Sequence, residues 1–314
     1  GFDLEAARIT ALPEDAFYIS DFITEDEEDW LLQKVSAMIA YEHVFYVLKI
    51  DVKYEQLLEY MCLPLYHFSS TTNAYINAAY HLFMFRPRSL RQSTGKISAA
   101  AALDPALAPQ TSNMAISLTK SNSLLESPLP AWLRSPIIEP RFEALRIFNN
   151  APHKGPNHVL VNEYQPGQGT MPHEDGAAYY PLVATVSLGA PIVLDLYHKP
   201  TQGDREENGA PAEAGRDVAG IPDPNRRPQY RILQERRSLL ITRGKLYTDL
   251  LHGIEETTRD EDLGPYSICN WELLREREPY QSGWYERQTR TSLTYRDVLH
   301  VVKMGNTLKF LGGR

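Results

Sequence analysis

The sequence predicts a mainly β fold, a barrel or a double-sheet roll with flanking helices. From residue 158 onward, short runs of β-branched and aromatic residues are separated by turns that contain Gly or Pro, which is typical of many short strands. Near the N-terminus, over residues 23–39, apolar residues instead recur at helical spacing. Together these two patterns predict an N-terminal helix and, after it, a β domain.

The helix over residues 23–39 has a well-defined predicted start. Thr24 and Glu27 stand three residues apart, as in a capping box, where each side chain binds the backbone N–H of the other residue. The acidic residues 25–28 suit the positive N-terminal end of a helix. The apolar face is formed by Leu31, Val35 and Met38.

The middle of the chain is less regular. Residues 92–130 are rich in Ser, Ala, Thr and Pro, which predicts a loop or a linker. Residues 40–90 are rich in aromatic residues without clean periodicity, and residues 36–124 as a whole have an unfamiliar character. We hypothesise that a faulty gene model, such as a retained intron or a shifted reading frame, produced this stretch. Abundant peptides spanning residues 45–110, found by mass spectrometry of native material, would refute that hypothesis.

The predicted strands are the runs HVLVNEY, LVATVSLG, IVLDLYH, RILQERRSLLITRG, YSICNWELL and RTSLTYRDV. Residues 199–229 interrupt them. This stretch is poor in apolar residues and rich in Pro, Gly and charge, so it predicts a disordered insertion between two strands. We therefore divide the chain into residues 1–157, with the helix, the irregular region and a linker, and residues 158–314, with the β domain.

Composition narrows the functional classes. With 32 Lys and Arg against 40 Asp and Glu, the net charge of −8 gives no general affinity for phosphates, so nucleic-acid binding would require a local basic patch. Two cysteines, Cys62 and Cys269, are too few for a disulfide framework and predict a reducing compartment. No apolar run reaches the roughly eighteen residues of a membrane helix. Because the chain begins with Gly1, its start gives no information about a targeting segment.

One motif has the chemistry of a metal site. His173 and Asp175 are separated by one residue, so on an extended segment their side chains point to the same face. His252, in the strand-like run at residues 250–254, is the candidate third ligand. Two imidazoles and one carboxylate form the facial triad of non-haem Fe(II), and the absence of a nearby cysteine argues against structural zinc. A His-x-Asp pair is common by itself, and ordinary polar residues are the alternative.

Two further groups of residues favour an organic acid beside that metal. On a strand, Arg290, Ser292 and Arg296 share one face, and inward-facing guanidiniums are costly unless an anion pairs with them. A dicarboxylate cosubstrate would supply that anion. Asn162 and Tyr164 also share a face and offer an amide and a phenol to carboxylate oxygens. Taken singly, surface ion pairs for the arginines and a structural role for the Asn–Tyr pair remain alternatives.

The order Asn-x-Tyr, His-x-Asp, His and Arg-x5-Arg resembles the AlkB family of Fe(II)/2-oxoglutarate dioxygenases. The sequences around these motifs are most similar to one eukaryotic branch of that family, AlkB homologue six. The matching stretches are NHVLVNEYQPGQGTMPHEDG, YYPLVATVSLGAPIVLDLY, LLHGIEE and RTSLTYR. They lie within residues 158–300, and the N-terminal helix and the LESPLPAWL stretch at 125–133 extend the resemblance.

The resemblance implies a double-stranded β-helix, the jelly-roll or cupin-like fold. It implies three iron ligands (His173, Asp175, His252) and five contacts to 2-oxoglutarate (Asn162, Tyr164, Arg290, Ser292, Arg296), of which Arg290 would pair with the distal carboxylate. The family's reaction uses dioxygen and 2-oxoglutarate, releases succinate and carbon dioxide, and oxidises an N-alkyl group that then leaves as formaldehyde. The implied substrates are alkylated bases in nucleic acid, single-stranded or damaged, and the implied compartments are the nucleus and the cytoplasm.

The sequence also departs from that family. Relatives that repair bases often carry an acidic residue shortly after the metal-binding Asp, whereas residues 176–178 here are Gly-Ala-Ala. Together with the acidic net charge, this leaves open a dioxygenase that acts on a protein or a small molecule. A third hypothesis is a non-catalytic binding or scaffold protein on the same fold, against which the intact triad and arginines argue. Residues 36–124 do not match the basic and aromatic segment that forms the substrate-covering loops of relatives.

Overall fold

The computed structural model describes residues 3–13, 15–48, 110–113, 124–125, 128–199 and 227–302. Its helical elements are η1 (Leu4–Ala7), α1 (Glu25–Leu48), α4 (Ala131–Leu133), η4 (Arg134–Phe142), α5 (Glu143–Leu145), α7 (Lys245–Thr248), η5 (Trp271–Leu273) and η6 (Glu278–Tyr280). Its strands are β1 (Ala16–Ile19), β2 (Gln110–Asn113), β3 (Leu124–Leu125), β4 (His158–Tyr164), β5 (Thr170–His173), β6 (Leu182–Leu188), β7 (Ile192–His198), β8 (Tyr230–Gln234), β9 (Leu239–Arg243), β10 (Leu250–Ile254), β11 (Arg259–Glu261), β12 (Trp284–Glu286), β13 (Arg290–Arg296) and β14 (Val301–Val302).

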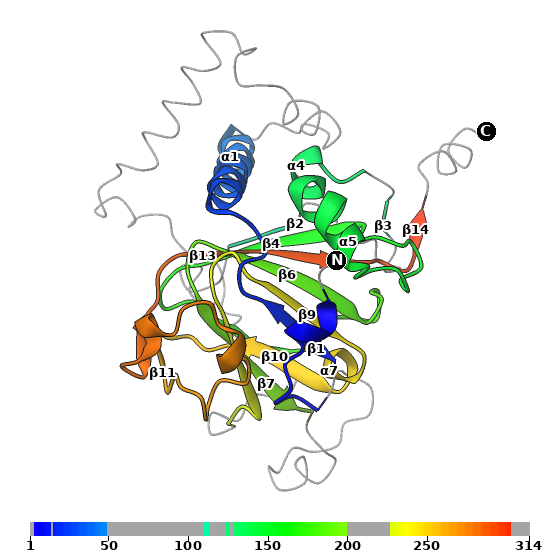
Figure 1. The fold of residues 1–314 in the computed structure, drawn as a ribbon. Coiled ribbons are helices and arrows are strands. Elements are labelled where there is room, and N and C mark those ends of the chain that lie inside the picture. The colour runs from blue at the N-terminus through cyan, green and yellow to red at the C-terminus, as the bar shows by residue number, and fades with distance from the viewer. Residues whose placement is uncertain are drawn as a thin grey trace, which may run out of the picture.

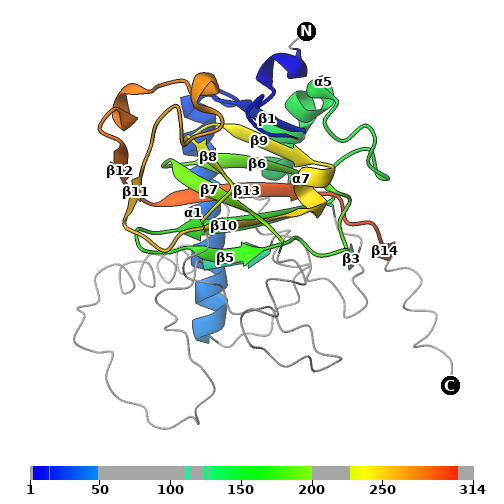
Figure 2. The same cartoon turned by 90° about the horizontal axis from the view of Figure 1, so that it is seen from below.

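Two antiparallel sheets face each other and form a double-stranded β-helix (Figure 1 and Figure 2). The larger sheet has the strand order β1-β9-β6-β13-β4-β2, and the smaller sheet has the order β5-β10-β7-β8. Between β4 and β13 the chain passes repeatedly from one sheet to the other, as it does in a jelly roll. The predicted mainly β fold with flanking helices is confirmed.

Strand β13 lies between β6 and β4 in the larger sheet. Because successive side chains of a strand point to opposite faces, Leu293 and Tyr295 enter the packed outer core and are fully buried. Arg290, Ser292 and Arg296 instead point into the space between the two sheets. The alternation predicted from RTSLTYR therefore brings its polar side chains to a single interior surface.

Helix α1 and the segment 131–145 cover the outer face of the larger sheet (Figure 1). The predicted helix is confirmed, and its backbone continues to Leu48. Its capping box is also formed, since Thr24 N donates to Glu27 Oε2 at 2.8 Å and Glu27 N donates to Thr24 Oγ1 at 3.3 Å. The predicted apolar positions Leu31, Val35 and Met38 are buried in the same core cluster as the sheet.

A second core lies on the outer side of the smaller sheet, under residues 263–285. The strand predicted from YSICNWELL is wrong, because residues 266–274 form turns and η5. The side chain of Asn270 accepts from Leu233 N at 3.0 Å and donates to Leu233 O at 2.8 Å, so it satisfies the edge of β8 in place of a further strand. Cys269 consequently lies outside any strand, half-buried against this core.

Several predictions concern residues outside the described ranges. They include most of the insertion at 199–229, most of the irregular region at 36–124, and Cys62. The division at residue 157 stays a prediction, although β1 pairs with β9 and so joins the N-terminal segment to the larger sheet. Within the described residues, no helix is both long enough and apolar enough to cross a membrane.

Candidate metal centre and its cavity

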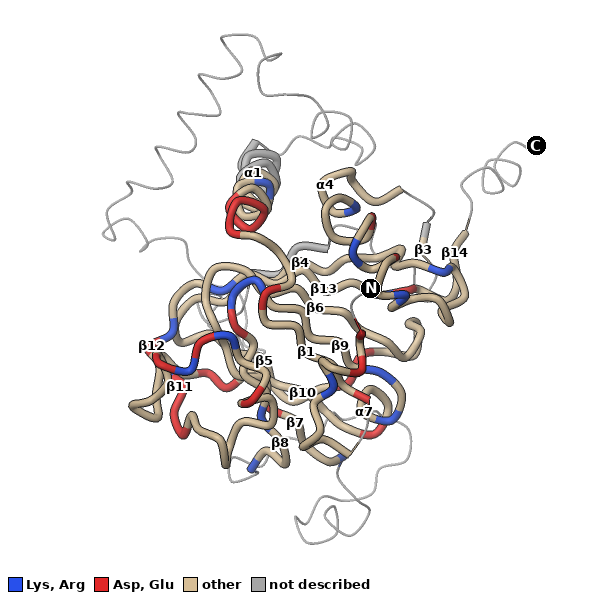
Figure 3. Tube along the Cα trace, in the orientation of Figure 1, with Lys and Arg blue, Asp and Glu red and all other residues tan. Residues whose placement is uncertain are grey.

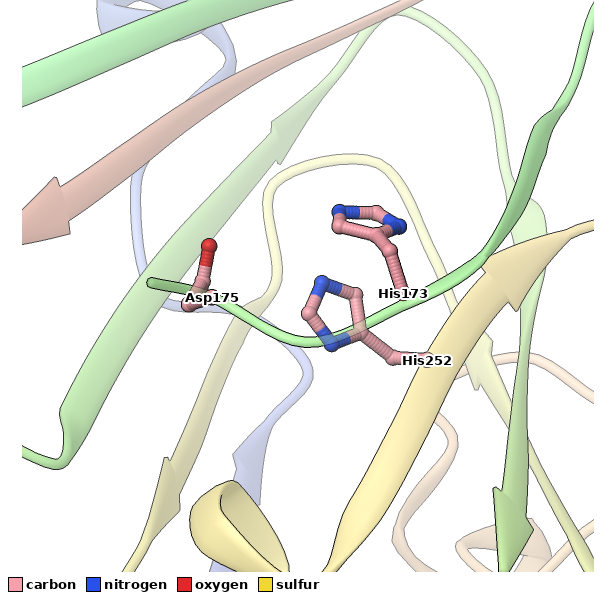
Figure 4. A group of neighbouring side chains, drawn as sticks. All are labelled: His173, Asp175 and His252. Atoms are coloured by element: carbon pink, nitrogen blue, oxygen red, sulfur yellow. The ribbon is translucent and has the colours of Figure 1, made fainter. Parts of the chain in front are cut away.

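Strands β5 and β10 bring the three predicted metal ligands together. His173 and His252 are directly opposite each other in this antiparallel pair, and their ring centroids are 4.3 Å apart. Asp175 follows two residues after the end of β5 and lies beside the two imidazoles (Figure 4). One potential ligand atom from each residue lies within 4.8 Å of the others, a separation that a single cation can bridge. His173 and His252, 79 positions apart in the chain, thus meet through cross-strand pairing.

Each of the two imidazoles can offer a ring nitrogen to a cation. His173 Nδ1 lies 2.9 Å from Met171 O, and a proton donated there leaves Nε2 free to coordinate a cation. Burial, followed by the nearby His173, lowers the pKa of His252 to about 4. His252 is therefore neutral near pH 7, which is the form that binds metal.

Two glycines allow β5 and β10 to approach so closely. A Cβ atom on Gly169 would lie 2.4 Å from Ile254 O, and a Cβ atom on Gly253 would lie 3.0 Å from Thr170 O. Any larger residue would push the two strands apart. Because His173 and His252 are carried by these same strands, the local sequence fixes the distance between the ligands.

A cavity of about 270 Å³ extends from the candidate metal centre into the space between the two sheets. The larger sheet contributes lining residues from β4, β6, β9 and β13, and the smaller sheet contributes lining residues from all four of its strands. The structure brings all eight predicted site residues to this one cavity: Asn162, Tyr164, His173, Asp175, His252, Arg290, Ser292 and Arg296. Their individual roles stay predictions.

Arg290 carries a buried charge at one end of the cavity. Its side chain donates to Ser187 Oγ at 2.8 Å and to Gln234 Oε1 at 3.3 Å, and both acceptors are neutral. Its Nε is buried and has no hydrogen-bond partner among the described residues. Burial lowers the pKa of Arg290 to about 10, and the positive charge of Arg287 adds to the lowering. Such a group fits a ligand that brings a negative charge.

Arg296 is in a different situation, because its charge already has a partner. Its Nη2 lies 2.6 Å from Asp175 Oδ1, and both side chains are largely buried. The ring of Tyr179 stacks 4.9 Å from its guanidinium carbon. In this structure Arg296 therefore contacts a candidate metal ligand, whereas the resemblance predicted a contact with the cosubstrate.

The sequence reasoning missed two residues that line this cavity, Gln234 and Tyr247, and a third, Ser187, behind it. Gln234 and Ser187 accept hydrogen bonds from Arg290, and the buried hydroxyl of Tyr247 has no partner among the described residues. Burial, followed by the charge of Asp175, raises the pKa of Tyr247, so its hydroxyl stays protonated. Strand alternation in the runs LVATVSLG and RILQ would have indicated Ser187 and Gln234, since each is a polar residue on an interior face.

The chain is similar to several known proteins. It is 34% identical over 195 residues to the probable RNA/DNA demethylase ALKBH6 of Danio rerio, covering 62% of this chain and 72% of that protein. It is 30% identical over 153 residues to the tRNA (carboxymethyluridine(34)-5-O)-methyltransferase alkbh8 of Xenopus tropicalis, covering 46% of this chain and 19% of that protein. The solved structure of OsALKBH1 matches 45% of this chain and 48% of its own, with 17% identity and a TM-score of 0.25. No family model matches the chain.

Proposed function

The chain belongs to the AlkB family of Fe(II)- and 2-oxoglutarate-dependent dioxygenases, and we propose that it removes alkyl groups oxidatively from bases in nucleic acid. The observation that carries this proposal is the position of the His173–Asp175–His252 triad at the same cavity as the unneutralised Arg290. A cation site and an anion site within one cavity fit a cosubstrate that chelates the metal at one end and carries a carboxylate at the other.

We propose Fe(II) as the metal. Two imidazole nitrogens and one carboxylate oxygen suit Fe(II), and none of the described residues at this cavity is a cysteine, which structural zinc sites usually include. Three ligands on one side of an ion leave the other positions open to small molecules. Second contacts orient the ligands, because Met171 O fixes the His173 ring and Arg296 holds one oxygen of Asp175.

The proposed cosubstrate is 2-oxoglutarate. Arg290 would bind its distal carboxylate, and Asn162, Tyr164 and Ser292 would contact the remainder of the molecule from the same sheet face. The orphaned Nε of Arg290 is the atom that such a carboxylate satisfies. When bound, Fe(II) and 2-oxoglutarate supply the oxidation of a substrate C–H bond by dioxygen, with succinate and carbon dioxide as by-products. The protein's part is to fix three ligands, hold the diacid and exclude bulk water.

Alkylated nucleic acid is the proposed substrate because a relative that is 34% identical over 195 residues carries the name of a probable RNA/DNA demethylase. Lys and Arg are interspersed with acidic residues along the described trace, as Figure 3 shows, and Arg236 and Arg237 are paired with acidic residues. The absence of an acidic residue in Gly176-Ala177-Ala178 favours the alternative, a dioxygenase acting on a protein or a small molecule.

Nucleus and cytoplasm are the proposed compartments, which imaging of the tagged protein would test.

The test is formaldehyde release, measured with Fe(II), 2-oxoglutarate and air. Single-stranded DNA and RNA with N-methylated bases are compared with methylated peptides at equal concentration. We expect release from a nucleic acid and none from the peptides, and His173→Ala should abolish it. Release from peptides alone would replace nucleic acid with the alternative substrate class, and absence of both formaldehyde and succinate would refute a dioxygenase.

A further inference from the structure

Gln234, at the end of β8, lies beside the guanidinium of Arg290 and lines the cavity. We propose that its carboxamide binds the distal carboxylate of a 2-oxo diacid together with Arg290, so that Gln234 helps to select the cosubstrate. This inference rests on the proposed function, because it concerns the same cavity. It adds a residue from the smaller sheet to a subsite whose predicted members all lie on the larger sheet.

The orientation of the Gln234 carboxamide follows from its neighbour. A guanidinium only donates hydrogen bonds, so the amide must present Oε1 to Arg290 Nη2, at 3.3 Å. The amide nitrogen then points away from Arg290. No described residue accepts a hydrogen bond from it, since its surroundings are largely apolar: Ile192 is its cross-strand partner and packs with Tyr164 and Ile254. Gln234 is 2% exposed and lines the cavity, so a carboxylate bound there would accept a hydrogen bond from its amide nitrogen.

Charge explains why a neutral side chain is suited to this position. Arg287, which lies near Arg290, is already neutralised by Asp260, with Nη2 of Arg287 2.6 Å from Asp260 Oδ1. Among the described residues, the Arg290 side chain donates hydrogen bonds to Ser187 and Gln234 and lies over the ring of Tyr164, and all three leave its charge intact. A glutamate at position 234 would form an internal ion pair and compete with any incoming carboxylate. Glutamine holds the guanidinium in place while keeping it available to an anion.

The competing explanation is that Gln234 only positions Arg290. Ser187 provides the comparison, because its hydroxyl accepts from the same Nη2 atom at 2.8 Å, a shorter distance, but Ser187 is not among the residues that line the cavity. If positioning were the whole role, Ser187→Ala would weaken diacid binding at least as much as Gln234→Leu. A direct contact from Gln234 predicts the opposite order.

The experiment is an anaerobic titration of the Fe(II)-loaded full chain with 2-oxoglutarate and, separately, with 2-oxopentanoate, which lacks the distal carboxylate. Binding is followed by calorimetry. Gln234→Leu removes a hydrogen bond to the charged distal carboxylate, so it should raise the Kd for 2-oxoglutarate about tenfold or more. Ser187→Ala should raise the same Kd about threefold or less. Gln234→Leu should leave the Kd for 2-oxopentanoate unchanged. The isosteric Gln234→Glu should weaken 2-oxoglutarate binding more than either of the other two variants.

Three results would overturn the inference: a larger effect of Ser187→Ala than of Gln234→Leu, equal weakening of both ligands by Gln234→Leu, or wild-type affinity in Gln234→Glu. Gln234→Glu keeps the shape of the side chain, so it provides a second test if Gln234→Leu does not fold. Failure of the proposed function is distinguishable, since the wild-type protein would then bind Fe(II) but neither 2-oxo acid, or would bind no Fe(II).

Discussion

At the scale of single residues, the cavity contains polar groups that the fold leaves unsatisfied. Arg290 is buried with two neutral partners, and Nε of Arg290, Nε of Arg296 and the hydroxyl of Tyr247 have no hydrogen-bond partner among the described residues. Buried groups in this state destabilise the protein until a ligand binds them. The residues that would serve the reaction therefore oppose stability in the free protein.

Arg290→Met tests whether a residue that would bind the cosubstrate destabilises the free protein. Replacing an unneutralised buried charge with an apolar chain of similar length should raise the free energy of unfolding by roughly 1 kcal/mol or more. The same change should abolish 2-oxoglutarate binding while Fe(II) binding persists. Urea unfolding and anaerobic calorimetry measure the two effects.

Arg287→Met is the matched control for that variant. Arg287 is as deeply buried, but it pairs with Asp260, so its loss should lower the free energy of unfolding by about 3–5 kcal/mol. If Arg290→Met destabilised the protein as much as Arg287→Met, the charge of Arg290 would have to be satisfied within the fold.

His158 makes the stability depend on pH. Burial, followed by the charge of Arg296, lowers the pKa of His158 from 6.5 to about 4 in the folded state. The unfolded chain then binds the proton more tightly, so acid favours unfolding, and stability present above pH 6.5 is lost as the pH falls toward 4. The shift corresponds to about 3 kcal/mol over this window. In metal-free protein, His158→Leu should remove that part of the pH dependence, measured as the urea midpoint at a series of pH values. If the midpoint of the variant fell with pH as steeply as that of the wild type, the assignment to His158 would be contradicted.

Sequence reasoning at this scale worked where the side chain's own chemistry gives the role. A His-x-Asp pair, a distant histidine and an Arg-x5-Arg strand carry their chemistry in the sequence. Gln234, Ser187 and Tyr247 do not, because an amide and hydroxyls are common in strands and helices. Their importance comes from contacts with Arg290 and Asp175, which depend on how distant segments pack.

At the scale of elements, the spacing of β5 and β10 sets the metal centre. Gly169→Ala would place a Cβ atom 2.4 Å from Ile254 O, so the strands must separate and carry His173 away from His252. We expect a loss of about 1–3 kcal/mol in unfolding free energy and weaker Fe(II) binding, measured by anaerobic titration. Gly176→Ala, with open space around its Cβ position, should change stability by less than about 0.5 kcal/mol. Equal Fe(II) affinity in both variants would refute this role for the strand spacing.

Elements defined by local interactions were predicted well. The capping box of α1 and the alternation in β4, β6, β7 and β13 involve neighbouring residues, so the pattern is visible in the sequence. Two predictions failed or were missing because the deciding interaction is distant. Residues 266–274 are not a strand since the Asn270 side chain bonds to Leu233, and β1 was not predicted since it depends on pairing with β9.

At the scale of the whole molecule, the described residues on both sides of position 157 share one core. Phe17, Leu31 and Leu133 pack in the same cluster as Leu293 and Tyr295 of β13. A protein that begins at residue 158 would therefore expose the outer face of the larger sheet. We expect it to lack cooperative thermal unfolding and to aggregate, whereas the full chain unfolds cooperatively. A soluble, cooperatively folding fragment that binds Fe(II) would show that the predicted division at residue 157 is a true domain boundary.

The central claim is that His173, Asp175 and His252 bind one Fe(II) at a cavity that accepts 2-oxoglutarate. The most direct test is an anaerobic titration of the metal-free chain with Fe(II) and then 2-oxoglutarate, followed by visible absorption. We predict one Fe(II) per chain and a weak charge-transfer band that forms only when both are present, with no Fe(II) retained by His173→Ala. Full Fe(II) retention by that variant, or no band in the wild-type protein, would contradict the account.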